Sequence, residues 1–434
     1  MTEVNPQIAD LYQKFISNGK SFSTDSRKLK SGDIFFALRG DSFNGNLFAS
    51  KALDMGASFV VVDEEVEGNP SKLIRCEDVL STFQALAQHH RRQFDIPVIA
   101  IAGSNGKTTT KELLTACLSA KYEVHATKGN FNNHIGVPIT LLEMSDTTEI
   151  AVIEIGTNSF GEIEFLCNLL EPNFGLITNI GKEHLEGFGN IEGVAKEESE
   201  LYQYLHSHNG FAFVNLDDVY LNRMSHRLLN KRGYSLTVEA ADLFIAVGLI
   251  PEIELKSGET TFRSRLQGQH NAENMAAAIS VSRHFNVADE KIGEALLSYR
   301  SSNNRSEWRE IGGNSFLLDA YNANPSSMVA ALNTFASANH NPKVILLGDM
   351  FELGVLAYEE HEKVAEMAWS IPNTEVYLVG DTFMKVCKNH GKEAFKDVQS
   401  LNIFLADQKY TNTWFLIKGS RSMRMEEALA AFES

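Results

Sequence analysis

The chain has 434 residues, with 39 lysines and arginines against 56 aspartates and glutamates, for a formal net charge of −17. This acidic balance argues against nucleic acid or an anionic membrane as a partner. The composition, 43% hydrophobic and 22% charged, is that of a globular protein, and at roughly 150 residues per domain the length predicts about three domains.

The four cysteines are scattered along the chain without a C-x-x-C pair, which predicts free thiols in a reducing cytosol. The first residues lack the basic and apolar regions of a signal peptide. No apolar run approaches the ~18 residues that a membrane span needs. We therefore expect a cytoplasmic protein, without membrane insertion, that acts as a monomer.

Residues 1–79 predict a small α/β domain. Strands are expected at 34–38 and 58–63, with a helix at 47–55 between them. The polar stretch Ser23-Thr-Asp-Ser-Arg27 precedes the first strand. It fits either a solvated turn or a pocket for a nucleotide sugar, in which Arg27 would face a phosphate.

A helix at 79–93 is expected to link this domain to a glycine loop. Residues 98–102 predict a buried parallel strand that ends at Gly103, and a helical pattern begins at Thr108. Backbone N–H groups of such a loop and helix start form a cradle for phosphate. Lys107 would reach the β- and γ-phosphates, and the Thr108 hydroxyl would hold Mg²⁺.

The sequence thus predicts an ATP site, although Ile101 stands where the usual motif has its first glycine. We expect contacts to ATP from the whole loop: Gly103, Ser104, Asn105, Gly106, Lys107, Thr108 and Thr109.

Two further strands bring candidate ligands to the same sheet edge. Glu154 lies near the carboxyl end of a strand at 150–156, where ligands of parallel sheets collect. It either forms a salt bridge or binds Mg²⁺. His184 follows a strand at 174–180 and is either an ordinary surface or core residue or a contact to metal or phosphate. The amide-rich loop 127–138, which follows the helix after the glycine loop, is either functional or filler.

The rest of the central region adds fewer signals. A helix at 191–202 carries Lys196 and Glu198 on nearly opposite faces, so only one of them can face the site. Short alternating runs at 233–266 predict antiparallel strands added to the parallel sheet. Asn271 and Asn274 share one face of the next helix, where they either pack or recognise a base. The polar break 301–306 predicts a domain joint, in which Arg305 is either solvated or clamps ATP.

Residues 310–434 predict a parallel, Rossmann-like sheet. Strands at 315–320, 343–347, 375–379 and 413–417 alternate with helices, the last of which is expected at 423–432. Polar loops follow three of these strands, at 319–328, 348–354 and 418–421, which predicts a binding face at one sheet edge. The chain is thus an α/β protein of three domains: 1–79, a central phosphate-loop domain 80–309 with added antiparallel strands, and 310–434.

Taken together, these segments resemble the Mur ligase family, ATP-dependent amino-acid-adding enzymes of peptidoglycan synthesis. The glycine loop matches the short phosphate motif of that family, and the segment Asp319-Ala-Tyr-Asn-Ala-Asn-Pro325 resembles the members that add a dipeptide. The resemblance implies UDP-N-acetylmuramoyl-tripeptide, ATP and D-alanyl-D-alanine as substrates of the three domains in chain order. ATP would convert the terminal carboxylate of the tripeptide into an acyl phosphate, which the dipeptide amine attacks.

The resemblance also implies residue roles. Lys107, His184 and Asp319 would be catalytic, and Asn271 and Arg305 would contact ATP. The magnesium ligands would be Thr108, Glu154, His184 and Glu198. Substrate contacts would come from Ser26, Arg27, Asn132, Asn133, Asn322, Asn324, Lys418 and Arg421.

The sequence departs from the family at three positions. Asn46 and His134 stand where relatives often carry histidine and aspartate, and Glu198 stands where many carry a lysine carbamylated by CO₂. Our hypothesis is that Glu198 replaces the carbamate and that Lys196 points away. Two rival interpretations stay open: a family ligase that adds a single amino acid, or a phosphate-loop NTPase that acts as a switch.

Overall fold

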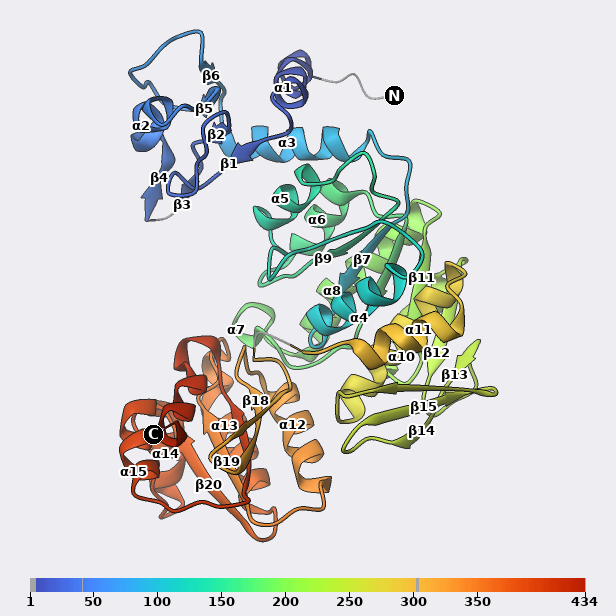
Figure 1. The fold of residues 1–434 in the computed structure, drawn as a ribbon, viewed down its shortest axis with the longest axis vertical. Helices are drawn as coiled ribbons and strands as arrows, with labels where there is room; N and C mark the ends of the chain where they lie inside the picture. Colours follow the sequence, from blue (N-terminus) through green and yellow to red (C-terminus); the bar gives the residue numbers. More distant parts are fainter. Residues whose placement is uncertain (1–4, 41, 302–303, 434) are drawn as a thin grey trace.

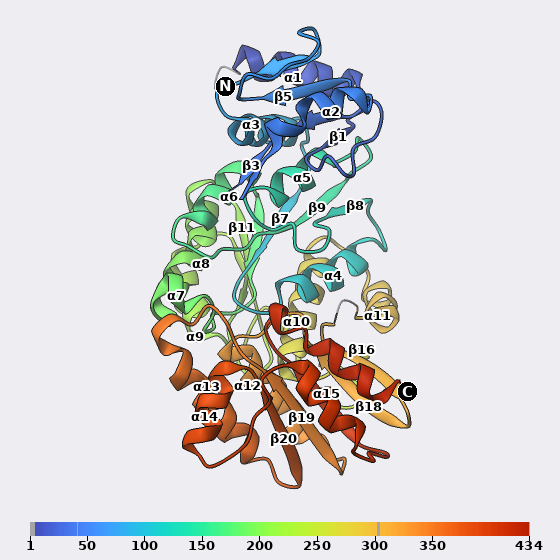
Figure 2. The same cartoon turned by 90° about the vertical axis from the view of Figure 1, so that its left-hand side faces the viewer.

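The computed structural model describes residues 5–40, 42–301 and 304–433. Figure 1 shows a row of α/β units, with the N-terminal segment at one end, the phosphate-loop region in the middle and the C-terminal segment at the other end. The view turned by 90° in Figure 2 shows the same elongated arrangement. Positions 302 and 303 of the predicted joint lie outside the described residues.

The N-terminal unit contains a parallel sheet in the order β1-β2-β5-β6. The expected strands are present, but helix α1 was not predicted, although Asn5 caps it and Pro6 occupies its first turn. The expected helix at 47–55 begins instead as a 3₁₀ turn, η1. The elements are α1 (Pro6–Ser17), β1 (Phe22–Ser23), β2 (Ile34–Phe36), β3 (Arg39–Gly40), β4 (Phe43–Asn44), η1 (Gly45–Phe48), α2 (Ala49–Asp54), β5 (Phe59–Val62) and β6 (Leu73–Arg75).

The predicted linking helix is α3 (Val79–Arg91), capped by Asp78. It packs against α1 on one side and against the helices α5 (Gly136–Leu142) and α6 (Glu162–Leu170) of the central unit on the other. Phe83 and Leu86 are fully buried there. This packing joins the first two units through a shared hydrophobic core.

The central sheet has seven parallel strands in the order β13-β12-β11-β10-β7-β9-β8. The strand before the glycine loop, β7, lies inside this sheet and is entirely buried, as expected. The strands are β7 (Val98–Ala102), β8 (Val124–Ala126), β9 (Ile150–Glu154), β10 (Phe174–Ile177), β11 (Phe211–Asn215), β12 (Lys231–Ser235) and β13 (Asp242–Leu243).

Helices cover both faces of this sheet because alternate side chains of β7 point to opposite sides. Ile99 and Ile101 pack against α4 (Lys107–Leu118), α10 (Gln269–His284) and α11 (Asp289–Ser298). Val98 and Ala100 belong to the core with α5, α6 and α8 (Ile191–Ser207). Shorter pieces lie at the edges: α7 (Leu185–Phe188), α9 (Val219–Met224) and η2 (Ser225–Arg227).

The prediction of antiparallel strands at 233–266 is correct for its second half only. The strands β14 (Ile245–Gly248), β15 (Ile253–Ser257) and β16 (Thr260–Ser264) form a separate antiparallel sheet. The first half was predicted wrongly, because β12 and β13 extend the central sheet in parallel. Alternation alone does not distinguish the two kinds of pairing.

The C-terminal sheet has the order β17-β18-β21-β19-β20. The four predicted strands are present and parallel, but the sheet is mixed, since β17 forms a hairpin with β18 through Gly312 and Gly313, both at positive φ. The expected last helix is 3₁₀, not α. The strands are β17 (Glu307–Ile311), β18 (Asn314–Asp319), β19 (Lys343–Gly348), β20 (Thr374–Val379) and β21 (Trp414–Lys418). The helices are α12 (Pro325–Ser337), η3 (Gly354–Leu356), α13 (Ala357–Trp369), α14 (Asp381–Asn389), α15 (Val398–Ala406), η4 (Arg421–Met423) and η5 (Met425–Phe432).

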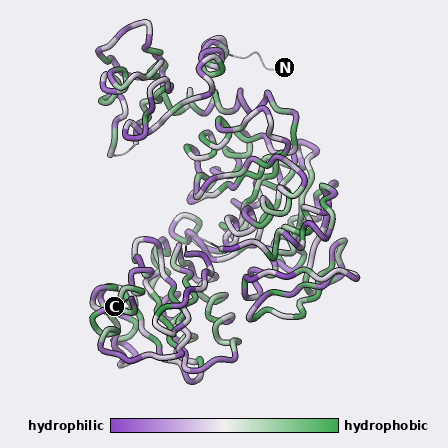
Figure 3. Tube along the Cα trace, viewed as in Figure 1, coloured by the Kyte–Doolittle hydropathy of each residue, from purple (hydrophilic) through white to green (hydrophobic). Residues whose placement is uncertain are grey.

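Hydrophobic and hydrophilic stretches alternate along the chain in all three units (Figure 3). In the described part of the chain, we find no helix with the length and apolar character needed to cross a membrane.

Candidate active site

The glycine loop connects β7 to α4 and has a shape that only glycine permits at two positions. Gly103 has φ 112° and Gly106 has φ 82°. A Cβ at Gly103 would collide with Thr178, and one at Gly106 would collide with the amide of Asn274. The loop is therefore pressed between β10 and α10, and the free N–H groups at the start of α4 face the site.

These N–H groups border a cavity of about 800 Å³ between the central and C-terminal units. The central unit contributes Ser104, Asn105, Gly106, Lys107, Thr108, Thr109, Asn132, Glu154, Asn179, Glu183, His184, His270 and Asn271 to its wall, and the C-terminal side contributes Arg305, Asp319, Tyr321, Asn322, Asn324, Glu352 and Lys418. Its volume falls in the range of small-molecule sites. The predicted loop and the predicted binding face of the last unit thus share one cavity.

The first predicted magnesium ligands lie side by side. Thr108 Oγ1 donates a hydrogen bond to Glu154 Oε2 at 2.9 Å, and Asn132 Nδ2 donates to Glu154 Oε1 at 2.9 Å. Lys111 Nζ lies 3.7 Å from the same buried carboxylate. A hydroxyl and a carboxylate beside a phosphate loop form a donor set that fits Mg²⁺.

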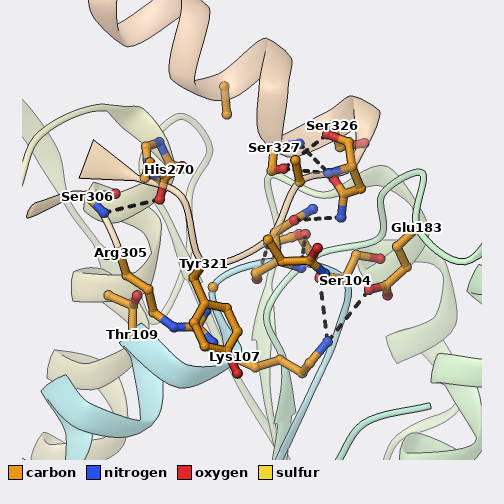
Figure 4. A pocket seen from close by; sticks show the side chains of 18 of the residues that line it. Ser104, Lys107, Thr109, Glu183, His270, Arg305, Ser306, Tyr321, Ser326 and Ser327 are labelled. Atoms are coloured by element: carbon orange, nitrogen blue, oxygen red, sulfur yellow. Dashed lines mark hydrogen bonds and ion pairs between the residues drawn. The ribbon is translucent and has the colours of Figure 1, made fainter. Parts of the chain in front are cut away.

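Lys107 lies near a second pair of acidic side chains, those of Glu183 and Glu198. Its Nζ donates to the carbonyl of Gly103 and lies 3.7 Å from Glu183 Oε2 (Figure 4). Glu198 accepts a hydrogen bond from Gly103 N at 2.8 Å. Burial raises the pKa of Glu198 to about 8, although the positive charge of Lys107 acts in the opposite direction.

Glu183 and Glu198 each keep one buried oxygen, Oε1, without a hydrogen-bond partner among the described residues. Such oxygens are costly unless a cation or donor meets them, so both carboxylates also fit a bound cation. They are not placed alike: Glu183 lines the cavity, whereas Glu198 is fully buried behind the loop.

His184 sits at the opening of the cavity in a left-handed conformation, φ 44°. Its Nδ1 lies 2.6 Å from Glu352 Oε2, and its Nε2 lies 3.9 Å from Glu183 Oε2. Among the residues that the structure describes, no three His, Cys, Asp or Glu side chains form a ready-made metal centre. Three of the four predicted ligands therefore fall into two half-sites: Thr108 lies with Glu154, and His184 lies near Glu183, which was not predicted.

The C-terminal wall holds its polar groups in mutual contacts. The Arg305 guanidinium lies 3.6 Å from the centre of the Tyr321 ring (Figure 4). Asp319 accepts from Lys418 Nζ at 2.5 Å and from Ser306 N at 3.1 Å. Burial alone would raise the pKa of Asp319, but the charge and hydrogen bond of Lys418 lower it overall. Asp319 is therefore ionised at neutral pH.

The amide of Asn324 connects the glycine loop to the C-terminal unit. Asn324 caps α12 and donates from Nδ2 to Asn105 Oδ1 at 2.9 Å. Asn322 lines the cavity, and its carbonyl accepts from Lys418. Asn271 is buried, with its amide bonded to Gln267 O and to Asn274.

Other predicted residues lie outside the cavity wall. Ser26 and Arg27 belong to the N-terminal unit, where Arg27 pairs with Asp25 and is 87% exposed. Asn133 Oδ1 accepts a hydrogen bond from Gly136 N, the first residue of α5, at 2.8 Å, and Arg421 pairs with Glu426. The pairing of Arg27 with Asp25 fits the solvated turn that was one of the two interpretations of residues 23–27.

Sequence reasoning missed several wall residues. Glu183 and Tyr321 each neighbour a predicted motif residue, so proximity was the available signal. The same signal was available for His270, which precedes Asn271 and whose buried Nδ1 has no partner in the described part of the chain, and for Glu352, which lies in the predicted polar loop 348–354. Burial lowers the pKa of His270, which keeps the ring neutral.

A phosphate loop whose lysine and threonine face a cavity shared with a second α/β unit defines a nucleotide-dependent enzyme. Residues 20–94 match the Mur ligase family, catalytic domain, residues 101–282 the Mur ligase middle domain, and residues 304–421 the Mur ligase, glutamate ligase domain. The chain belongs to the Mur ligase family.

Relatives with known names cover nearly the whole chain. The UDP-N-acetylmuramoyl-tripeptide–D-alanyl-D-alanine ligase of Bacillus subtilis is 32% identical over 98% of this chain and 94% of its own length. The enzyme of the same name from Escherichia coli is 33% identical over 95% of this chain and 93% of its own length.

Solved structures agree with the fold. MurF from Acinetobacter baumannii superposes with a TM-score of 0.88 at 27% identity, covering 97% of this chain and 98% of that one. MurF ligase from Thermotoga maritima in complex with ADP gives a TM-score of 0.84 at 26% identity, covering 95% of this chain and 97% of that one. The three-domain α/β arrangement predicted from the sequence is confirmed.

Proposed function

We propose that this chain joins D-alanyl-D-alanine to the terminal carboxylate of UDP-N-acetylmuramoyl-tripeptide, with conversion of ATP to ADP and phosphate. As a member of the Mur ligase family it is an ATP-dependent ligase. The names of its full-length relatives support this choice of substrates. The observation that carries the proposal is the single cavity that joins the phosphate loop to the Asp319–Asn324 loop of the C-terminal unit.

The geometry fits amide formation through an acyl phosphate. A carboxylate is a poor electrophile, and phosphoryl transfer to it depends on positioning and on neutralising charge. Lys107 would neutralise the γ-phosphoryl group, and Arg305, held on Tyr321, would contact ATP from the other wall. The dipeptide amine would then displace phosphate from the acyl group.

Magnesium belongs to this proposal. Thr108 and Glu154 would hold one ion, and His184 with the carboxylates of Glu183 and Glu198 would hold a second. When bound, magnesium would neutralise the phosphate oxygens. Asp319, already ionised and paired with Lys418, would orient ATP at the domain joint.

We also propose that the three units divide the substrates, with a monomer as the working form. The N-terminal unit (1–79) would hold the UDP end near Ser26 and Arg27, the central unit (80–309) ATP, and the C-terminal unit (310–434) the dipeptide. Since β17 spans the boundary at 309/310, we place the start of the last unit before Glu307. Asn132, Asn133, Asn322, Asn324, Lys418 and Arg421 remain the proposed substrate contacts.

The decisive experiment offers UDP-muramyl tripeptides to the protein together with D-alanyl-D-alanine and free amino acids, and identifies the products by mass spectrometry. We expect the mass increase of the dipeptide alone. Addition of a single amino acid would favour another ligase of the family. ADP release without either substrate would favour a phosphate-loop switch.

A further inference from the structure

The turn after β19 touches the His184 segment with both its backbone and a side chain. The carbonyl of Glu352 accepts a hydrogen bond from Glu186 N at 3.0 Å. Its carboxylate Oε2 lies 2.6 Å from His184 Nδ1. Glu352 belongs to the C-terminal unit and His184 to the central unit, so the contact crosses the joint beside the cavity.

Both residues adopt a conformation that non-glycine residues seldom adopt. The φ angle of His184 is 44° and that of Glu352 is 63°. Such strain persists where the surroundings hold it, and it concentrates at functional sites. Gly354 also has a positive φ, 53°, and a Cβ there would be in van der Waals contact with Glu186. The backbone on both sides of the joint therefore supports the contact between Glu352 and His184.

The contact determines which ring nitrogen of His184 carries the proton. An ionised carboxylate only accepts hydrogen bonds, so Nδ1 must donate to Glu352. In the neutral ring the other nitrogen, Nε2, keeps its lone pair on the side of Glu183 and the cavity. Outer carboxylates that hold a histidine in this way set its tautomer and direction.

We propose that Glu352 is a positioning residue that fixes the tautomer and direction of His184 when the C-terminal unit docks on the central unit. The lone pair of Nε2 is then presented to the cavity only in the docked arrangement. This inference rests on the proposed function for its link to catalysis, but the state of the ring can be measured without substrates.

The chain provides a matched control at the same joint. Lys182 Nζ pairs with Glu360 Oε1 at 2.7 Å, again between the central and C-terminal units. Glu360 lies on α13 and does not line the cavity wall described above. Glu360→Ala therefore removes an ion pair across the joint without removing the acceptor of His184.

The first test measures the ring directly. The protein, free of nucleotide and metal, is labelled with ¹⁵N-histidine, and the His184 signals are identified by their loss in His184→Asn. We expect the wild type and Glu360→Ala to carry the proton on Nδ1, and Glu352→Ala to shift it in part to Nε2. An unchanged tautomer in Glu352→Ala would overturn the proposal.

The second test separates positioning from docking. We expect kcat for ligation to fall on the order of 10–100-fold in Glu352→Ala, with little change in KM for the UDP-muramyl peptide. Glu352→Gln should recover part of the loss because its amide oxygen still accepts, and Glu360→Ala should stay within about twofold of wild type. Equal losses of kcat in Glu352→Ala and Glu360→Ala would show that Glu352 only helps the two units to dock. If the wild type did not catalyse ligation, the proposed function would be wrong. The ¹⁵N measurement would still test the role of Glu352, because it needs no substrate.

Discussion

At the scale of single residues, Glu198 is the most informative departure from the family pattern. Its carboxylate accepts from Gly103 N, and its second oxygen is buried without a partner in the described residues. Lys196 is exposed, with Nζ 5.4 Å from the centre of the Phe160 ring, so it points away as expected. A glutamate carboxylate at position 198 would replace the carbamate group without any reaction with CO₂.

We therefore predict that wild-type ligation does not depend on bicarbonate. Glu198→Lys should lose most activity because it places an ammonium group beside Lys107, and bicarbonate should restore part of it by forming a carbamate. The measurement is the ligation rate in CO₂-free buffer with and without added bicarbonate. A wild type that needs bicarbonate would contradict the hypothesis and direct attention to Lys196.

A second residue-scale prediction concerns the hydroxyl of Thr108. Thr108→Val keeps the shape of the side chain but removes the donor to Glu154. The variant also lacks the oxygen that is proposed to bind Mg²⁺. If that contact is worth as much as a hydrogen bond to a charged group, about 1.5–3 kcal/mol, ATP affinity in the presence of Mg²⁺ should fall by roughly 10–100-fold. Calorimetry with Mg²⁺ and with EDTA checks this result.

The matched control for that substitution is Thr115→Val on the same helix. Within the residues that the structure describes, the Thr115 hydroxyl bonds only to the backbone of its own helix, at Lys111 O. Its ATP affinity should match wild type, and the difference between Mg²⁺ and EDTA should be kept. If both valine variants lost affinity equally, the loss would reflect helix stability and not a metal ligand.

At the scale of elements, the sequence correctly predicted the strands, loops and helices that depend on local residue patterns. The buried strand β7, the glycine loop and α4 follow from one apolar run, two glycines and a helix start. Helix α1 was missed because its amphipathic pattern lies before the first strong strand. Strand β17 was missed although its pairing is local, since Gly312-Gly313 between two strand segments is a hairpin signal.

In the candidate site, too, some residues were predictable from sequence patterns, and others are brought together only by tertiary packing. Thr108 and Glu154 were predicted together because neighbouring parallel strands end at one sheet edge. The burial of Glu198 behind the loop and the approach of Glu352 to His184 depend on how helices and whole units pack. No spacing within the sequence encodes those contacts.

The packing of α1 on α3 predicts a pH effect on stability. His90 is fully buried, with Nδ1 3.0 Å from the Tyr12 hydroxyl and Nε2 3.2 Å from Met144 O. Burial lowers the pKa of His90 to about 4. Between pH 6.5 and 4 the unfolded chain therefore binds a proton that the folded protein does not, and stability must fall as the pH is lowered.

We expect His90 to add up to about 1.4 kcal/mol per pH unit to this loss. In His90→Gln the free energy of unfolding should fall less steeply over the same range. Urea denaturation at several pH values measures the slopes. His206→Gln, on the exposed side of α8, should keep the wild-type slope, and an identical slope in His90→Gln would show that His90 does not titrate in this way.

At the scale of the whole molecule, the proposed substrates have to span all three units. The central and C-terminal units already touch through Asn105 with Asn324, Lys182 N with Ser326 Oγ at 2.8 Å, and His184 with Glu352. The N-terminal unit lies at the far end of the row, joined through α3 (Figure 1). A UDP-muramyl peptide held near Arg27 must therefore extend from the N-terminal unit to the cavity.

This arrangement predicts that the units draw together only when every site is filled. Closing around the reactants excludes water and completes the reacting geometry. We expect small-angle X-ray scattering to give a smaller radius of gyration with an ATP analogue, UDP-muramyl tripeptide and D-alanyl-D-alanine than with any one of them. Lys107→Ala should weaken the compaction, because the phosphate loop then lacks the cation that meets the γ-phosphate. Equal dimensions in all mixtures would mean that the reaction proceeds in the arrangement of Figure 1, with the tripeptide reaching across on its own length.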